Sequence, residues 1–410
     1  MTTTSRSAAR HGGTRGERTP IGTLLLIVLA SLSAIAPIAT DLYLPAFPTM
    51  TGDLATGATA VQLTLTAFLV GVAVGQLVFG PLSDRVGRLR PLIGGAAICV
   101  IASALAALAP TIELLVAARF VQGLAGAAGM VIGRAVISDL AAGPAAARAF
   151  SIMTLVTGVA PILAPFVGSL LVGGIGWRGV LWVVFALAAV MLVAVVAVVR
   201  ETHTPERRRR ARMERAENGS AAQDLISRTF LGNTGAYGFG FAVMMAYIAA
   251  SPFLYQVLLG MNEIAYGLSF GANAAGLVIV GSVAARLSAS RSIRGMLGLG
   301  LSVVGAATVA LLIVVVAGAP HWLIPIPIFV AVSGLGLVLG NATAAALQAV
   351  PRASGSGSAL LGALQFGLGA AVSPLVSLGG ENDPLPLAIV MVTCALIALA
   401  AFVVAGRPAD

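Results

Sequence analysis

Two charged side chains stand inside long apolar stretches of the chain, where a charge is costly. Asp41 comes late in the first stretch and Arg119 early in the fourth. Within a membrane such a group must face protein or water, or lose its charge. Burial favours the neutral form of an acid, so a residue like Asp41 can bind and release a proton as its surroundings change. The alternatives are an Asp41 that caps a loop at the outer interface and an Arg119 whose stem carries its charge to the interface.

The arginine in the fourth stretch belongs to a regular pattern. Arg119, Gln122, Gly126, Gly129 and Gly133 follow one another at steps of three and four residues. Such steps return to the same side of a helix. This face is polar at one end and small along the rest, which predicts that it lines a cavity.

A short turn follows the second apolar stretch. It contains Gly80, Asp84, Arg85, Gly87 and Arg88. Glycine permits tight backbone paths, and the charged side chains can bind helix ends or one another. We predict that the turn is a latch between helix bundles and binds no substrate itself.

Gly158, Pro161, Pro165 and Gly168 share one face of the fifth stretch. Proline removes backbone hydrogen bonds and kinks a helix, and glycine lets a neighbouring helix approach closely. We predict a structural role in helix packing. The alternative is the general glycine content of the chain, which has 49 Gly.

Methionine and aromatic residues gather after the middle of the chain, at Met244, Met245, Tyr247, Phe253 and Tyr255. Adaptable thioethers beside aromatic rings suit a pocket for varied apolar ligands. An aromatic belt at the membrane surface is the alternative. The predicted substrate-binding residues are Tyr43, Phe68, Gln122, Tyr247, Phe253, Tyr255 and Gln365.

The elements that position these residues are membrane-spanning helices. The chain is 58% hydrophobic and only 10% charged, with mean hydropathy +1.00, whereas soluble domains carry about 25% charged residues. Apolar runs long enough to cross a bilayer recur throughout, and lipid tolerates runs of this length only as helices. We predict twelve spans, at residues 21–44, 59–80, 91–109, 112–133, 149–173, 177–199, 228–250, 264–285, 295–317, 321–347, 357–378 and 384–405.

The arginines predict the topology. With twelve spans, every basic residue except Arg119 and Arg178 falls on one side of the membrane, with Arg134 in the connection after the fourth span. The positive-inside rule makes that side cytoplasmic, both termini included. The predicted units are a tail at 1–20, six-helix bundles at 21–199 and 228–405 joined by a cytoplasmic linker at 200–227, and a tail at 406–410. Weak similarity between the bundles indicates a transporter built from repeats.

Composition argues against other classes of protein. The net charge of +9 would suit nucleic acid in a soluble protein, but here it reflects arginines in cytoplasmic loops. The two cysteines and three histidines form no metal, disulfide or catalytic pattern. We therefore predict no enzyme, no metal and no cofactor.

Taken together, these motifs resemble the major facilitator superfamily along nearly the whole chain. Residues 80–88 match its signature turn, although Leu89 replaces a basic residue there and Arg90 can substitute for it. Residues 119–123 resemble the span-four signature, and residues 158–168 resemble the span-five signature of drug:proton antiporters. Segments 41–48, 134–140 and 251–253 resemble the Bcr/CflA branch, which exports bicyclomycin, chloramphenicol and similar drugs. That branch often has a second arginine where Ser138 stands.

The resemblance implies a proton-driven exporter of amphipathic drugs that works by alternating access in the cytoplasmic membrane. It makes Asp41 the proton-coupling acid and Arg119 a group that influences its protonation. The expected partners are a small amphipathic drug, protons and membrane lipid, and the expected state is a monomer. Export of an endogenous metabolite, uptake by symport, a channel and a non-transporting receptor or scaffold are the alternatives.

Overall fold

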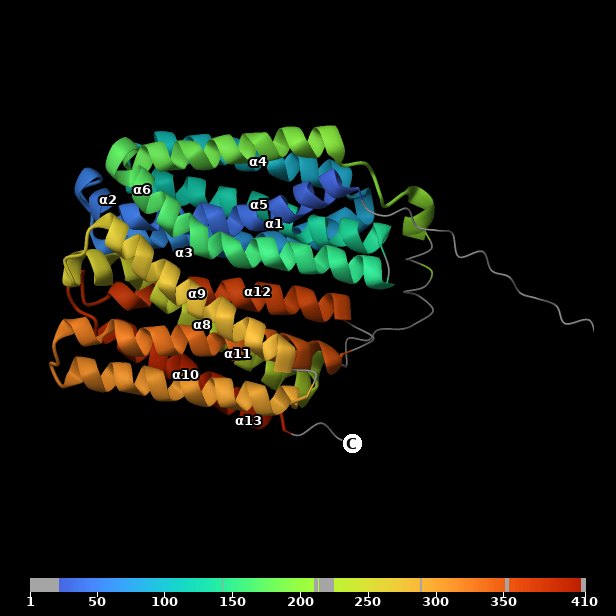
Figure 1. The fold of residues 1–410 in the computed structure, drawn as a ribbon. Helices are drawn as coiled ribbons and strands as arrows, with labels where there is room; N and C mark the ends of the chain where they lie inside the picture. Colours follow the sequence, from blue (N-terminus) through green and yellow to red (C-terminus); the bar gives the residue numbers. More distant parts are fainter. Residues whose placement is uncertain are drawn as a thin grey trace, which may run out of the picture.

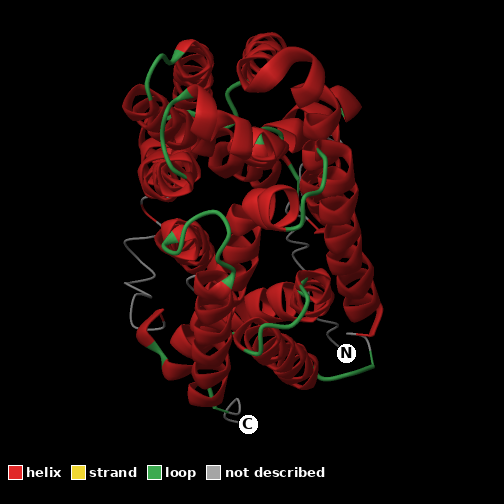
Figure 2. Cartoon of the chain, turned by 90° about the vertical axis from the view of Figure 1, so that its left-hand side faces the viewer, coloured by secondary structure: helices red, strands yellow, loops and turns green. Residues whose placement is uncertain are grey.

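The computed structural model of the protein describes residues 22–141, 143–209, 213, 225–287, 290–350 and 354–406. Over these residues the chain forms helices and short connections, and no strand occurs there (Figure 2). The predicted tail at 1–20, residues 407–410 and most of the predicted linker lie outside the described residues.

The first half of the fold occupies one side of the molecule (Figure 1). Its helices are α1 (Thr23–Asp41), η1 (Leu44–Ala46), α2 (Phe47–Asp53), α3 (Ala58–Val86), α4 (Leu89–Leu108), α5 (Ile112–Leu140) and α6 (Gly143–Val198).

The second half lies beside it, with its helices roughly parallel to those of the first (Figure 1). It consists of α8 (Arg228–Pro252), η3 (Phe253–Leu258), α9 (Glu263–Leu287), α10 (Ile293–Val316), η4 (His321–Leu323), α11 (Pro325–Gln348), α12 (Ser354–Val372), η6 (Ser373–Ser377) and α13 (Leu385–Val404).

The helix α6 makes two crossings. Among the described residues, 11 helical segments are long and apolar enough to span a membrane, and one of them, Arg148–Val198, has 51 residues. A straight helix of this length rises about 1.5 Å per residue and would be more than twice as long as the thickness of a bilayer core. It breaks at Gly176, whose φ of 65° lies in the left-handed region that favours glycine. Its two arms meet at the label α6 in Figure 1, so the prediction of twelve spans in an all-helical membrane fold is confirmed.

The outer faces of the helices carry large apolar side chains. Leu155, Val193, Ile279 and Ile313 are all more than half exposed. Apolar surface of this extent is rare on a soluble protein and suits contact with lipid. Helix starts follow ordinary capping rules where they can be seen, since the Ser227 and Ser292 hydroxyls accept hydrogen bonds from the backbone of Phe230 and Gly295.

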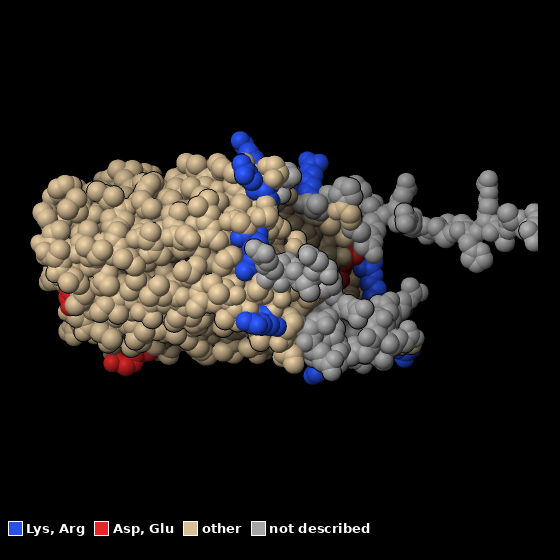
Figure 3. All heavy atoms as spheres, turned by 90° about the horizontal axis from the view of Figure 1, so that it is seen from below, with Lys and Arg blue, Asp and Glu red and all other residues tan. Residues whose placement is uncertain are grey.

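One end of the bundle carries most of the described arginines, including Arg85, Arg88, Arg208 and Arg294. We call it the arginine end, and the other end the far end. Figure 3 shows one long face, on which the visible arginines gather toward one end and a broad uncharged surface covers the middle. This is the pattern that the positive-inside rule describes.

The helix α5 is longer than predicted. The expected span ended at residue 133 and placed Arg134 in a loop, but α5 continues to Leu140. The prediction treated a charged residue as the end of a span, whereas a helix can extend beyond the lipid and line an interior space. Arg134 therefore lies within the helical bundle rather than in a connection.

The two halves meet at the far end. The amide nitrogen of Gln62 donates to the carbonyl oxygen of Ala249 over 2.9 Å, and that of Gln256 donates to Pro45 over 3.0 Å. The Thr59 hydroxyl reaches the carbonyl oxygen of Ser377 at 3.3 Å. Together these bonds hold the halves closed at this end.

Candidate functional site

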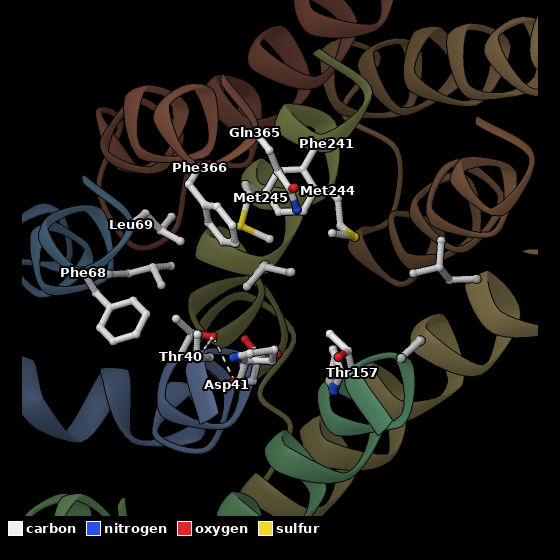
Figure 4. A pocket seen from close by; sticks show the side chains of 18 of the residues that line it. Thr40, Asp41, Phe68, Leu69, Thr157, Phe241, Met244, Met245, Gln365 and Phe366 are labelled. Carbon is white, nitrogen blue, oxygen red and sulfur yellow. Dashed lines mark hydrogen bonds between the residues drawn. The ribbon is translucent and has the colours of Figure 1, made fainter. Parts of the chain in front are cut away.

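A cavity of about 290 Å³ lies between the two halves. Its walls come from α1, α3, α5 and α6 on one side and from α8, α9, α11 and α12 on the other. Most of the lining is apolar, aromatic or thioether in character (Figure 4). Figure 4 shows Phe68, Phe241, Met244, Met245 and Phe366 around the open space. Such a lining accommodates apolar ligands of varied shape.

Among the described residues that line this cavity, Asp41 is the one acidic side chain. It is the last residue of α1, and only 4% of its surface is exposed. The neighbouring Thr40 turns its hydroxyl back to the carbonyl oxygens of Ala36 and Pro37. Asp41 is therefore an inward-facing acid beside the cavity and not an interfacial cap.

Arg119 lies behind the cavity wall and is fully buried. Its Nη2 donates to the carbonyl oxygen of Ala39 over 2.9 Å, and its Nη1 donates to Gln122. The guanidinium carbon lies 4.4 Å from the ring centroids of both Tyr43 and Phe68. Cation–π contact and hydrogen bonds thus replace an ion pair as the stabilising surroundings of this charge.

The polar contacts continue away from the cavity. The amide nitrogen of Gln122 donates to the Ser103 hydroxyl over 2.7 Å, and that hydroxyl donates to the carbonyl oxygen of Cys99. A Cβ on Gly129 would stand 3.2 Å from the carbonyl oxygen of Leu32 in α1. The predicted cavity face of α5 therefore packs against α1 and α4. Its small residues serve close helix approach, and the α5 residues that line the cavity are Met130 and Arg134.

The seven predicted substrate residues fall into three groups. Phe68, Tyr247 and Gln365 line the cavity. Tyr43 is buried and hydrogen-bonded to Thr64 at 2.9 Å, and Gln122 is held by Arg119. Phe253 and Tyr255 lie nearer the far end.

These last two aromatic residues belong to the packing between elements. The Phe253 ring stands 6.2 Å from that of Phe47, across the two halves. Asn273 donates from Nδ2 to the hydroxyls of both Tyr247 and Tyr255, over 3.0 and 3.3 Å. In this conformation Tyr255 is thus linked to the cavity through Asn273 and Tyr247.

The turn between α3 and α4 is held by Arg88. Its guanidinium forms ion pairs with Asp84 at 2.7 Å and with Asp139 of α5 at 3.1 Å. It also donates to the Ser83 hydroxyl. Arg85 is exposed and offers its carbonyl oxygen to Arg208.

Glu201, just after α6, completes this arrangement and was not predicted. Its carboxylate accepts hydrogen bonds from the backbone of Arg88, Leu89 and His203 over 2.8 to 3.1 Å. Gly87 has a φ of 105°, and a Cβ there would stand 2.6 Å from Glu201 Oε2. Gly80 has no such restriction, since its Cβ would have 3.9 Å to the nearest atom. The sequence offered no signal for Glu201 because it lies far from the turn in the chain.

The four predicted helix-packing residues in the first arm of α6 have two kinds of surroundings. A Cβ on Gly168 would collide with the carbonyl oxygen of Leu42, so this glycine packs directly on the chain after α1. Pro165 is buried. Gly158 and Pro161 instead line the cavity, and Gly158 has open space where a Cβ would be.

The motif profile of the Major Facilitator Superfamily matches residues 29–374. The chain belongs to this superfamily. Superfamily members are transporters, so this chain is a transporter rather than an enzyme.

Several known superfamily members are similar to this chain. The "Uncharacterized MFS-type transporter YdgK" of Bacillus subtilis is 32% identical over 92% of this chain and 94% of its own. The "Bicyclomycin resistance protein homolog" of Haemophilus influenzae is 28% identical over 92% of this chain and 95% of its own. A solved D-xylose–proton symporter shares the fold with a TM-score of 0.73 at 14% identity, over 92% of this chain and 96% of its own.

Proposed function

We propose that this transporter exports amphipathic drugs, of the chloramphenicol or bicyclomycin kind, in exchange for protons. One observation carries the proposal: the cavity has an apolar and aromatic lining in which Asp41 is buried at the end of α1. A single acid in such a lining can hold a proton or stand charged beside a bound ligand, so its protonation and drug binding can compete.

The relatives support the substrate class. Antibiotic resistance stands in the name of a relative that aligns along nearly the full length of both chains. The thioethers of Met244 and Met245 and the rings of Phe241 and Phe366 supply the deformable apolar surface that drug-sized molecules need.

The transport cycle follows from the closed far end. In the conformation described, the halves are joined at that end through Gln62 and Gln256. If the arginine end is cytoplasmic, as the arginines predict, a drug enters from the cytoplasm and meets a deprotonated Asp41. The halves then rock, the far end opens, and a proton from outside replaces the drug. Each positive charge that moves inward across 100 mV supplies about 2.3 kcal/mol.

The location and state of the protein belong to the same proposal. The transporter resides in the cytoplasmic membrane with both termini in the cytoplasm, and it acts as a monomer. The uneven distribution of arginines supports the orientation, and the cavity is complete within one chain.

The test uses purified protein in proteoliposomes with an imposed pH gradient and labelled chloramphenicol. Asp41→Asn should abolish gradient-driven drug transport and retain drug exchange without a gradient, because the cavity survives and only the proton carrier is lost. Glu263→Gln, an acid at the start of α9 outside the cavity, is the matched control and should behave as wild type. Gradient-driven transport by Asp41→Asn at the wild-type rate would refute the role of Asp41. Counterflow with a metabolite panel would identify an endogenous substrate instead.

A further inference from the structure

Between Asp41 and the arginine end, the cavity presents hydrogen-bond donors for which the described part of the chain provides no acceptor. The clearest is Gln76 of α3, whose side chain is only 6% exposed. Its amide nitrogen has no hydrogen-bond partner among the described residues. Its amide oxygen faces α12, where a Cβ on Gly362 would stand in direct collision with it. A buried donor without an acceptor destabilises the protein, and a ligand that accepts its hydrogen bond removes this cost.

Arg134 of α5 is the second donor. It lines the cavity, its side chain is exposed to that space, and no hydrogen bond or ion pair of its guanidinium occurs among the described residues. Tyr237 of α8 lies near this guanidinium. A guanidinium fork offers parallel donors that match a group with two oxygens.

Gln365 of α12 is the third. Its amide oxygen accepts a hydrogen bond from the Tyr237 hydroxyl over 2.6 Å. This bond fixes the orientation of the amide, so its nitrogen is left to donate. Figure 4 shows the Gln365 amide at the edge of the open space, beside Phe241 and Met245. Three helices from both halves therefore bring donors to one part of the cavity.

These three donors lie nearer the arginine end of the cavity than Asp41 does. Arg119, which contacts Ala39 near Asp41, precedes Arg134 on α5 by about 22 Å of helix rise, at 1.5 Å per residue. Gln76 follows Phe68 on α3 by about 12 Å on the same basis. A helical side chain leans toward the start of its helix, so the Arg134 stem leans into the cavity. The three polar side chains thus lie nearer the arginine end than Asp41 does, and apolar residues of the lining separate them from it.

We propose that Arg134, Gln76 and Gln365 form a subsite for a two-oxygen acceptor group, a nitro or a carboxylate, carried on an apolar or aromatic body. The acceptor receives hydrogen bonds from the three side chains, and the body lies against Phe241, Met244 and Phe366. The inference rests on the proposed function for the path by which such a molecule is exported. It adds the chemical feature that the site selects, and it disfavours substrates whose polar group is a cation.

The test measures the affinity of purified protein in lipid nanodiscs for a matched pair of ligands. The pair is chloramphenicol and the same molecule with its nitro group reduced to an amine. Wild type should bind the nitro compound about tenfold more tightly, as expected for a hydrogen bond from a charged donor. Arg134→Met and Gln76→Leu should each remove most of this preference and leave affinity for the amine within about twofold.

Controls separate the subsite from general damage. Arg148→Met removes an exposed arginine that does not line the cavity and should keep the preference. Arg134→Lys keeps the charge without the fork and should retain an intermediate preference, which also covers the case that Arg134→Met fails to fold. Equal loss of affinity for both ligands in the Arg134 and Gln76 variants would overturn the proposal, as would a wild type without preference.

A second pair makes the test independent of drug export. Benzoate should raise the unfolding temperature of wild type more than benzyl alcohol does, and this difference should vanish in Arg134→Met. No difference between the two compounds in wild type would overturn the subsite. Retained acceptor preference without proton-driven drug efflux would refute the proposed function and leave the subsite in place.

Discussion

The Nη2 atom of Arg119 donates to the carbonyl oxygen of Ala39 over 2.9 Å, two residues before Asp41. This bond joins the middle of the first half, in α5, to the end of α1 where the acid stands. Because the guanidinium is also held between Tyr43 and Phe68, it fixes the position of the last turn of α1. We propose that Arg119 thereby positions Asp41 from behind the cavity wall.

Arg119→Lys should therefore weaken both stability and coupling. Lysine keeps the charge but cannot reach Ala39 and Gln122 in the same fork, so buried acceptors lose their donor at a cost on the order of 2 kcal/mol. We expect a lower unfolding temperature and slower gradient-driven transport. Thermal unfolding of the purified variant and proteoliposome transport measure these effects. Unchanged values for both would show that the fork does not position α1.

The two glycines of the α3–α4 turn should respond differently to alanine. Gly87→Ala forces a side chain into a conformation that costs about 1–3 kcal/mol and pushes a Cβ against Glu201. Gly80→Ala makes only an ordinary van der Waals contact within a helix and should be neutral or slightly stabilising. Thermal unfolding and transport rate of the pair test the point. Equal behaviour of the two variants would contradict a specific strain at Gly87.

The surroundings of Glu201 predict that the stability of the fold depends on pH. Partial burial raises the pKa of Glu201, but hydrogen bonds from the backbone of Arg88, His203 and Leu89, together with Arg208, outweigh this and leave the pKa below its ordinary value. A lowered folded-state pKa stabilises the fold above the ordinary pKa, near 4.3, and this contribution is lost as pH falls through the folded value.

Glu201→Gln should thus lower the unfolding temperature at pH 7. The difference from wild type should shrink as the pH falls below about 4, where wild-type Glu201 becomes protonated as well. Unfolding temperatures of both proteins between pH 3 and pH 8 give the measurement. A difference that stays constant across this range would show that the charge of Glu201 has no part in it.

Gln62 should set the balance between conformations. Its bond to Ala249 closes the far end, and a hydrogen bond contributes about 1 kcal/mol, or roughly fivefold in an equilibrium. Gln62→Leu should increase the fraction of molecules open at the far end, seen by distances between spin labels across that end. Thr49→Val removes a bond to Ala46 within the first half and is the control. Identical distance distributions for Gln62→Leu and wild type would contradict this role.

The sequence predicts where the helices lie better than it predicts which side of each helix faces the cavity. Twelve spans were predictable because apolar runs and arginine positions depend on the membrane, which acts on the chain locally. The break at Gly176 agrees with the predicted spans, of which one ends at residue 173 and the next begins at residue 177. Asp41 was identifiable because a buried acid is costly wherever it lies.

The side that each helix turns to the cavity was not predictable to the same degree. Gln122 and the glycines of α5 share a face, but that face packs on α1 and α4 because their small size allows close approach. Arg134 was assigned to a loop, although its segment resembled a known branch of the superfamily. Glu201 contacts Arg88 and Leu89, and Gln76 faces Gly362, across long separations in sequence. Helix periodicity alone carries no information on such contacts.

We propose that drug export and proton import are one coupled process through Asp41. The most direct measurement follows proton movement driven by a drug gradient, in proteoliposomes that contain wild-type protein and a pH-sensitive dye inside. With chloramphenicol loaded in the lumen and no initial pH gradient, drug leaving the vesicles should acidify the lumen, and Asp41→Asn should show no acidification. Drug efflux by wild type with no movement of protons would contradict the account.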